Sequence, residues 1–111
     1  KTFLSQLADV AMQQASAMNV QDLNNTAWAY ANLDICNEPL MLRLAESALA
    51  LQAAFDARSA AIMLWAFGRL LVGTPTLLRG MVETMLPLVP EAGPQALSNA
   101  VWACATHRFY D

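Results

Sequence analysis

Few residues of this chain have the types and spacings that a chemical reaction needs. His107 is the only histidine, and no set of ligands or acid–base partners stands at a spacing that would build a catalytic or metal site around it. Asp9, Glu46 and Glu83 recur 37 residues apart, which indicates repeated positions on a solvated helix face rather than a general acid–base pair. The glycine motifs that cradle phosphates are also absent from the sequence. We therefore predict a non-enzymatic protein with no cofactor and no metal.

The composition argues against a large basic surface and against a membrane span. The chain has six Lys and Arg residues and nine Asp and Glu residues. The resulting net charge of −3 does not favour strong, non-specific binding to phosphate. The richest apolar stretch, 60–72, is too short to cross a bilayer and contains Arg69. With no secretory signal visible, we expect Cys36 and Cys104 to be buried free thiols. Because the chain starts with Lys1, we expect it to be part of a longer protein.

Three tryptophans define a repeat. Trp28, Trp65 and Trp102 are the only tryptophans, each lies 37 residues after the last, and each is followed by alanine. A fixed period of this length is typical of stacked helix hairpins. The hydrophobic content of 57% is rich in alanine, leucine and methionine, which favour helices over strands. We predict an all-α fold, a right-handed α-α superhelix (α-solenoid) of about six helices.

Capping residues set the limits of the expected helices. Asn19, Asp56 and Gly93 share the 37-residue spacing and begin the helices that carry tryptophan, here called A helices, over 20–33, 57–71 and 94–108. The intervening B helices are expected over 2–15, 39–52 and 75–88, and Pro87 is expected to fray the last of them. The chain then divides into a B helix of a preceding repeat (1–18), two repeats (19–55 and 56–92) and the A helix of a truncated repeat (93–111). Both ends cut through a repeat, so we expect apolar surface to be exposed there.

Each A helix should bury one apolar stripe. The three stripes are Leu23, Ala27, Tyr30 and Ala31; Ala60, Leu64, Phe67 and Gly68; and Leu97, Val101, Cys104 and Ala105. The tryptophans flank these stripes. We interpret them as packing residues, with base stacking as the alternative.

The A-helix segments resemble a known repeat family. Residues 20–31 read V-Q-D-L-N-N-T-A-W-A-Y-A, and residues 94–103 read P-Q-A-L-S-N-A-V-W-A. Both closely resemble the A helix of the octotricopeptide repeat, while A-R-S-A-A-I-M-L-W-A-F at 57–67 is a weaker copy without the Q-D and N-T pairs. The resemblance implies a chloroplast or mitochondrial protein that acts in RNA maturation, stability or translation. It also implies that one repeat contacts about one nucleotide through polar residues of its A helix.

The A-helix face opposite the apolar stripe carries the candidate ligand-binding residues. An amide can donate to and accept from a base edge, and arginine can contact phosphate or stack on a base. Alanines at 29, 66 and 103 would leave room for a flat base. The remaining positions include Asp22, Ile62 and Ala96, and the RNA-binding candidates are Gln21, Asn25, Asn32, Arg58, Ser59, Arg69, Gln95, Asn99 and Thr106.

Two other interpretations of this face stay open. Its polar residues can be the solvated side of an amphipathic helix, or Asn25 and Asn99 can bond between neighbouring helices. We expect single-stranded RNA as the partner, with no DNA and no membrane insertion. The alternative function is an α-solenoid scaffold for protein–protein interaction within a larger organellar complex, which the acidic balance and the six methionines favour.

Overall fold

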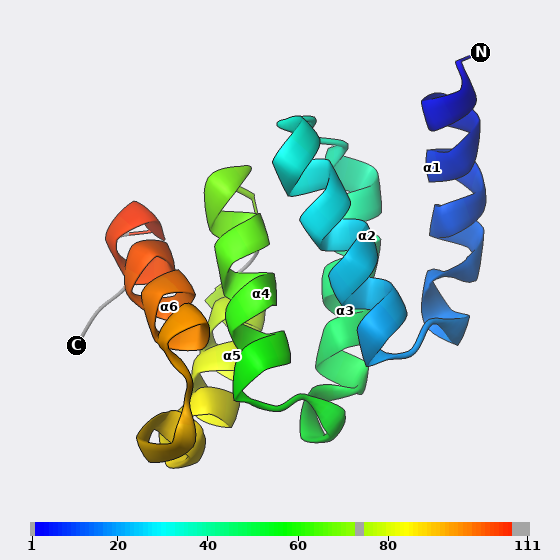
Figure 1. Cartoon of the computed structure of the whole chain (residues 1–111). Helices are drawn as coiled ribbons and strands as arrows, with labels where there is room; N and C mark the ends of the chain where they lie inside the picture. Colours follow the sequence, from blue (N-terminus) through cyan, green and yellow to red (C-terminus); the bar gives the residue numbers. More distant parts are fainter. Residues whose placement is uncertain (1, 73–74, 108–111) are drawn as a thin grey trace.

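The computed structural model describes residues 2–72 and 75–107, with the main chain alone at residue 107. Six α-helices and no strand lie in these ranges, which confirms the all-α prediction (Figure 1). The α-helices are α1 (Phe3–Gln14), α2 (Val20–Leu33), α3 (Glu38–Ala50), α4 (Ala57–Arg69), α5 (Pro75–Met85) and α6 (Pro94–His107). Three short 3-10 helices follow α1, α3 and α5, namely η1 (Ala15–Ala17), η2 (Gln52–Ala54) and η3 (Leu86–Glu91).

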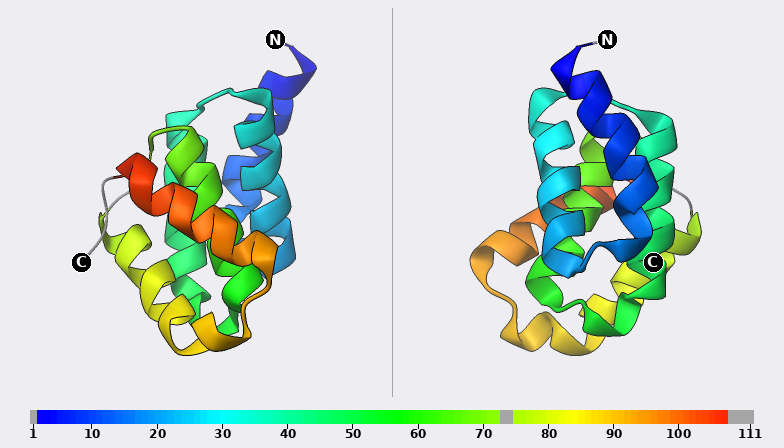
Figure 2. Two further views of the ribbon diagram at one scale, coloured as in Figure 1. Left: turned by 60° about the vertical axis from the view of Figure 1, so that its left-hand side comes forward. Right: turned by 90° about the vertical axis from the view of Figure 1, so that its right-hand side faces the viewer.

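The helices form two layers. Helices α2, α4 and α6 contact one another in order, as do α1, α3 and α5, and the layers are joined by contacts of α2 with α3 and of α4 with α5. Figure 1 shows α6, α4 and α2 side by side in front of α5 and α3, and Figure 2 shows α2 and α3 standing apart behind α1. The molecule measures 45 × 25 × 23 Å. A helix of 14 residues is only about 21 Å long, so the long axis runs across the helices.

The 37-residue period reappears in the backbone. The 3-10 helices η1 and η2 are one period apart, and each precedes an extended residue, Met18 with φ −75° or Phe55 with φ −80°. The next residue is an N-cap in both cases. The side chains of Asn19 and Asp56 accept hydrogen bonds from the backbone N–H groups three residues on. These caps confirm the predicted starts of α2 and α4.

Left-handed residues end the first two A helices at equivalent positions. Asp34 has φ 57° and Leu71 has φ 54°. The N–H groups of Ile35 and Val72 donate to the carbonyls of Tyr30 and Phe67, at 3.1 and 3.0 Å. This geometry satisfies carbonyls of the last turn and stops the helix. It ends α4 at Arg69 rather than at the predicted Leu71.

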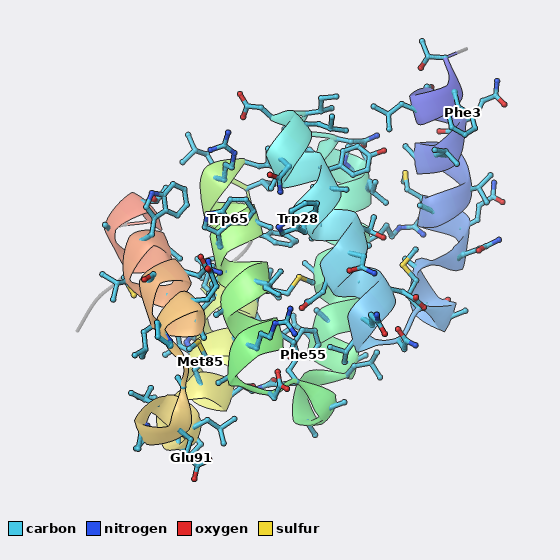
Figure 3. All side chains as sticks on the ribbon, in the orientation of Figure 1. Phe3, Trp28, Phe55, Trp65, Met85 and Glu91 are labelled. Atoms are coloured by element: carbon cyan, nitrogen blue, oxygen red, sulfur yellow. The ribbon has the colours of Figure 1, made fainter. Side chains whose placement is uncertain are left out.

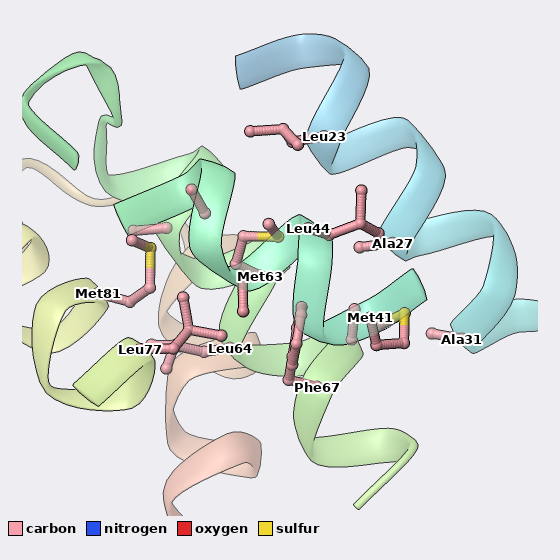
Figure 4. Packing of buried hydrophobic residues seen from close by; sticks show 14 of the residues in the cluster. Leu23, Ala27, Ala31, Met41, Leu44, Met63, Leu64, Phe67, Leu77 and Met81 are labelled. Atoms are coloured by element: carbon pink, nitrogen blue, oxygen red, sulfur yellow. The ribbon is translucent and has the colours of Figure 1, made fainter. Parts of the chain in front are cut away.

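The core lies between the two layers. Every residue of the stripes predicted for α2 and α4 is buried. Leucines and methionines of α3 and α5 meet them, as Figure 4 shows for Met41, Leu44, Leu77 and Met81. The stripes are buried because each A helix packs on the B helix that follows it and on the neighbouring A helix.

The stripe predicted for α6 is exposed or half-buried, in agreement with the prediction of apolar surface at the ends of the chain. Leu97 and Val101 are 39% and 69% exposed, Ala105 is exposed and Cys104 is half-buried. Helix α6 instead buries Ala96 and Ala103, because α4 is the helix that packs most closely on it. In the described ranges no B helix follows α6 to cover the predicted stripe.

Apolar side chains are exposed at both ends of the helix array, as predicted. Phe3 and Leu7 of α1 are 77% and 47% exposed, and Val101 marks the other end. Asp9, Glu46 and Glu83 are also exposed, as expected for a solvated face of α1, α3 and α5. In the part of the chain that the structure describes, no helix is long and apolar enough to span a bilayer.

Several details of the boundaries and cysteines differ from expectation. Helix α3 begins at Glu38 rather than Pro39, and α5 gives way after Met85 to η3, which contains the predicted disrupting Pro87. The expected last residue of the third A helix, Arg108, lies outside the described residues. Both cysteines are free, but Cys36 is exposed, so the prediction of a buried thiol is wrong there, and Cys104 is only half-buried. Cys36 lies in the turn between α2 and α3, where neither layer covers it.

Candidate functional site

Two adjoining cavities open along the layer formed by α2, α4 and α6. The α2–α4 cavity has a volume of about 470 Å³ and is lined by Val20, Gln21, Asn24, Asn25, Ala54, Asp56, Arg58, Ser59 and Ile62. The α4–α6 cavity has a volume of about 370 Å³ and is lined by Trp28, Arg58, Ile62, Trp65, Gln95, Ala96 and Asn99. Arg58 and Ile62 line both cavities, so one charged side chain borders two adjacent spaces.

The cavities bring together most of the candidate residues. Gln21, Arg58 and Gln95 are equivalent by the 37-residue period and occupy the first turns of three neighbouring helices. Asn25 and Asn99 stand one turn further along α2 and α6. These five residues and Ser59 line the two cavities.

Three candidates lie outside the cavities, at the opposite ends of the A helices. Asn32 and Thr106 each donate to the carbonyl four residues earlier in their own helix, at 2.9 Å. Arg69 donates from Nε to the carbonyl of Ala31 at 2.8 Å and so ties α4 to the last turn of α2. A cation at a helix C-terminus is favourable because of the helix dipole. The bonds of Asn32, Arg69 and Thr106 are structural.

Ser59 is engaged by the helix cap. Its hydroxyl accepts from the backbone N–H of Asp56 at 2.8 Å, and its own N–H donates to the Asp56 carboxylate at 2.8 Å. These bonds form a capping box at the start of α4. The hydrogen bond from the Ser59 N–H is the largest cause that lowers the pKa of Asp56, and the bond from the Ser59 hydroxyl is the second. The α2–α4 cavity therefore holds an anionic carboxylate beside Arg58.

Asn24 is a structural residue that the sequence analysis missed. It is 7% exposed, and its Nδ2 donates to the Ser59 carbonyl at 3.3 Å. This bond joins α2 to the first turn of α4 on one wall of the α2–α4 cavity. The alternative of an interhelical bond names Asn25 and Asn99, but Asn25 is exposed and Asn99 accepts from Gln95 within α6. The residue equivalent to Asn24 in the next repeat is Ala61, a small apolar residue. Its type could have indicated that this position of the repeat faces the interior.

The alanines at 29, 66 and 103 were predicted to leave room for a base on the A-helix face, and two of them do not. Ala66 and Ala103 are fully or almost fully buried, and Ala96, also placed on the exposed face, is buried as well. They lie where α4 and α6 pack on each other, and alanine allows that close approach. Of the alanines predicted to admit a base, only Ala29 is partly exposed.

The tryptophans lie closer to the candidate site than the sequence analysis expected. Trp65 packs against the core, in agreement with the packing interpretation. Trp28 and Trp102 are 52% and 40% exposed, so packing is not a sufficient description of them. Figure 3 shows Trp28 and Trp65 on the same face of α2 and α4, where both line the α4–α6 cavity.

The described residues contain no group of three or more His, Cys, Asp and Glu side chains that could hold a metal ion. The side chain of His107 lies outside the described residues. A comparison with protein-family models and with curated proteins finds no match.

Proposed function

We propose that this chain is a helical-repeat module, part of a right-handed α-solenoid, that binds single-stranded RNA through the layer formed by α2, α4 and α6. One observation carries the proposal. Repeat-equivalent polar residues, Gln21, Arg58 and Gln95, line two adjoining cavities in that layer. The sequence resemblance to the octotricopeptide repeat supports the same ligand and a chloroplast or mitochondrial location.

The spacing of the helices suits a polymer with a regular repeat. Neighbouring packed helices lie about 8–10 Å apart, so each cavity is one step along the layer. A single strand crossing the layer would place successive bases in successive cavities. Amides at Gln21, Asn25 and Asn99 offer both donors and acceptors to base edges. Arg58 borders both cavities, and in this arrangement it would contact the phosphate that joins two nucleotides.

Charge limits the strength of this interaction. Asp56 lines the same cavity as Arg58 and would repel phosphate. Each phosphate neutralised on a single strand contributes about −0.7 to the slope of log K against log salt. One arginine between two cavities therefore predicts modest affinity with a shallow salt dependence.

The test measures anisotropy of a labelled, unstructured RNA oligonucleotide across a salt series. Arg58→Ala is expected to weaken binding and to reduce the magnitude of the salt slope by about 0.7. The matched control is Arg79→Ala, which removes an exposed arginine from α5 in the other layer. No binding at low salt would reject the RNA proposal. Equal losses in the two variants would reject its assignment to this layer.

A protein-interaction scaffold is the second candidate, and the exposed apolar ends of the array favour it. Phe3 and Leu7 on α1 and Val101 on α6 present apolar surface without a covering helix among the described residues. A scaffold predicts association that Val101→Ser abolishes and Arg58→Ala leaves unchanged. Analytical ultracentrifugation of the variants alongside the RNA titration separates the two functions.

A further inference from the structure

The α4–α6 cavity has an aromatic wall and a polar wall. Trp28 and Trp65 contribute indole rings from α2 and α4, and Gln95 and Asn99 contribute amides from the first turns of α6. Arg58 stands at the border with the neighbouring cavity. Three helices thus supply flat apolar surface, hydrogen-bonding groups and a positive charge to one space of about 370 Å³.

The two indoles differ in how firmly they are held. Trp65 is partly buried, its ring centroid lies 6.4 Å from that of Trp102 at an interplanar angle of 44°, and the guanidinium of Arg69 lies 6.0 Å from its ring centroid. Arg69 is itself fixed to the Ala31 carbonyl. Trp28, in contrast, is 52% exposed. The cavity therefore combines a fixed ring with one that still offers half of its surface for contact.

The two amides that line the cavity are hydrogen-bonded to each other, and the edge of a ligand can replace that bond. Nε2 of Gln95 donates to Oδ1 of Asn99 at 3.2 Å. This exposed hydrogen bond contributes little net free energy, so exchanging it for bonds to a ligand costs little. An apolar peptide side chain could use the indoles but would gain no hydrogen bond from either amide. A planar group with donors and acceptors on its edge satisfies both walls.

We propose that the α4–α6 cavity receives one unpaired nucleobase of single-stranded RNA, stacked on the Trp28 indole and hydrogen-bonded at its edge by Gln95 and Asn99. This inference rests on the proposed RNA-binding function and assigns a direct contact to a tryptophan that the repeat pattern alone describes as packing. Arg58 then holds the phosphate on the side of the α2–α4 cavity. Stacking on an aromatic ring tolerates any base, so selectivity at this position comes from the amides.

The experiment compares two probes of equal length and charge, an oligoadenylate and an oligomer of abasic ribose phosphates. The full chain is expected to bind the oligoadenylate about 5- to 100-fold more tightly, because only that probe has bases to stack. Trp28→Leu is expected to lower oligoadenylate affinity about fivefold or more and to leave the abasic probe unaffected. Trp28→Phe, which retains an aromatic face, should stay within about threefold of the unmodified chain.

The control is Phe3→Leu, which removes an exposed aromatic ring from α1 in the other layer and should change neither affinity. Circular dichroism of each variant establishes that the helices persist. Equal binding of the two probes, or an unchanged oligoadenylate affinity in Trp28→Leu, overturns base stacking and leaves the RNA-binding proposal intact. Failure of both probes to bind at low salt overturns the RNA-binding proposal and the stacking inference together.

Discussion

Replacing Asp56 by alanine removes the side chain that caps α4. The Asp56 carboxylate accepts from the Ser59 N–H at 2.8 Å and from the Ser59 hydroxyl at 2.8 Å. Losing an N-cap of this kind costs about 1 kcal/mol, within a range of about 0.5–2. Helix α4 contacts α2, α5 and α6, so its fraying would affect the whole array. For a chain of this size we expect a melting temperature lower by about 3–6 °C at pH 7.

The loss should depend on pH in a defined direction. Hydrogen bonds from Ser59 lower the pKa of Asp56 in the folded state below its ordinary value of 3.8. The folded state therefore favours the carboxylate, and this stabilisation is complete above the ordinary pKa. It is lost as the pH falls through the lowered, folded-state pKa. The difference in unfolding free energy between the unmodified chain and Asp56→Ala should shrink across that acidic range.

Asp56→Asn supplies the matched control. Asparagine is as good an N-cap as aspartate, and Asn19 already caps α2 in the equivalent position. This variant should keep most of the stability at pH 7 and lose the acid-linked part. It also removes a negative charge from the α2–α4 cavity, so we expect RNA affinity to rise while stability is held.

Urea unfolding followed by circular dichroism from pH 7 down to about pH 2 measures all three chains, so that the series passes well below the ordinary pKa of 3.8. The reasoning fails if Asp56→Ala is as stable as the unmodified chain at pH 7. It also fails if the free-energy difference between them stays constant as the solution is acidified.

Three further changes test other parts of the structure. Leu71 is exposed with φ 54°, so Leu71→Gly should raise the unfolding free energy by about 0.5–1 kcal/mol. Leu71→Ala keeps Cβ and its strain and should not raise it. Equal effects of the two changes in denaturant titrations would contradict the left-handed geometry. Asn24→Ala removes the buried bond to the Ser59 carbonyl and should cost about 1–2 kcal/mol in the same assay, and a neutral effect would show that this bond does not hold α2 to α4. The Tyr30 hydroxyl is buried without a hydrogen-bond partner among the described residues, and burial raises its pKa. Tyr30→Phe should therefore be neutral or stabilise the fold by up to about 1 kcal/mol. A clear loss of melting temperature would mean that the hydroxyl has a partner.

Features that depend on a few consecutive residues could be predicted from the sequence. The caps at Asn19 and Asp56 join a side chain to a backbone N–H three residues away, so no other part of the fold is needed to place them. The end of α5 near Pro87 is equally local. The period then extends these local signals from one repeat to the next.

Features that depend on which helices lie alongside could not be predicted in the same way. Helix α6 turns Ala96 and Ala103 inward because α4 packs on it, although Leu97 and Val101 are more apolar. Pairing these residues requires knowledge of the neighbouring helix, which the pattern of one helix does not contain.

The arrangement of the candidate site could also be predicted only in part. The face that carries Gln21, Arg58 and Gln95 was identified because equivalent residues of a repeat share one orientation. The exposure of Trp28 was not, because its regular spacing was interpreted as the mark of a packing residue. The left-handed conformation of Leu71 was also missed, because leucine gives no signal for it, although its period partner Asp34 is a residue type that tolerates it.

The most direct test of RNA binding by this layer is a titration of the ¹⁵N-labelled chain with a single-stranded RNA oligonucleotide, followed by NMR. We predict that the shifted signals come from the amides around Gln21, Arg58 and Gln95 and from the indole N–H groups of Trp28 and Trp65. The signals of α1, α3 and α5 should stay in place. Shifts confined to those three helices, or no shifts at low salt, would contradict RNA binding by the layer of α2, α4 and α6.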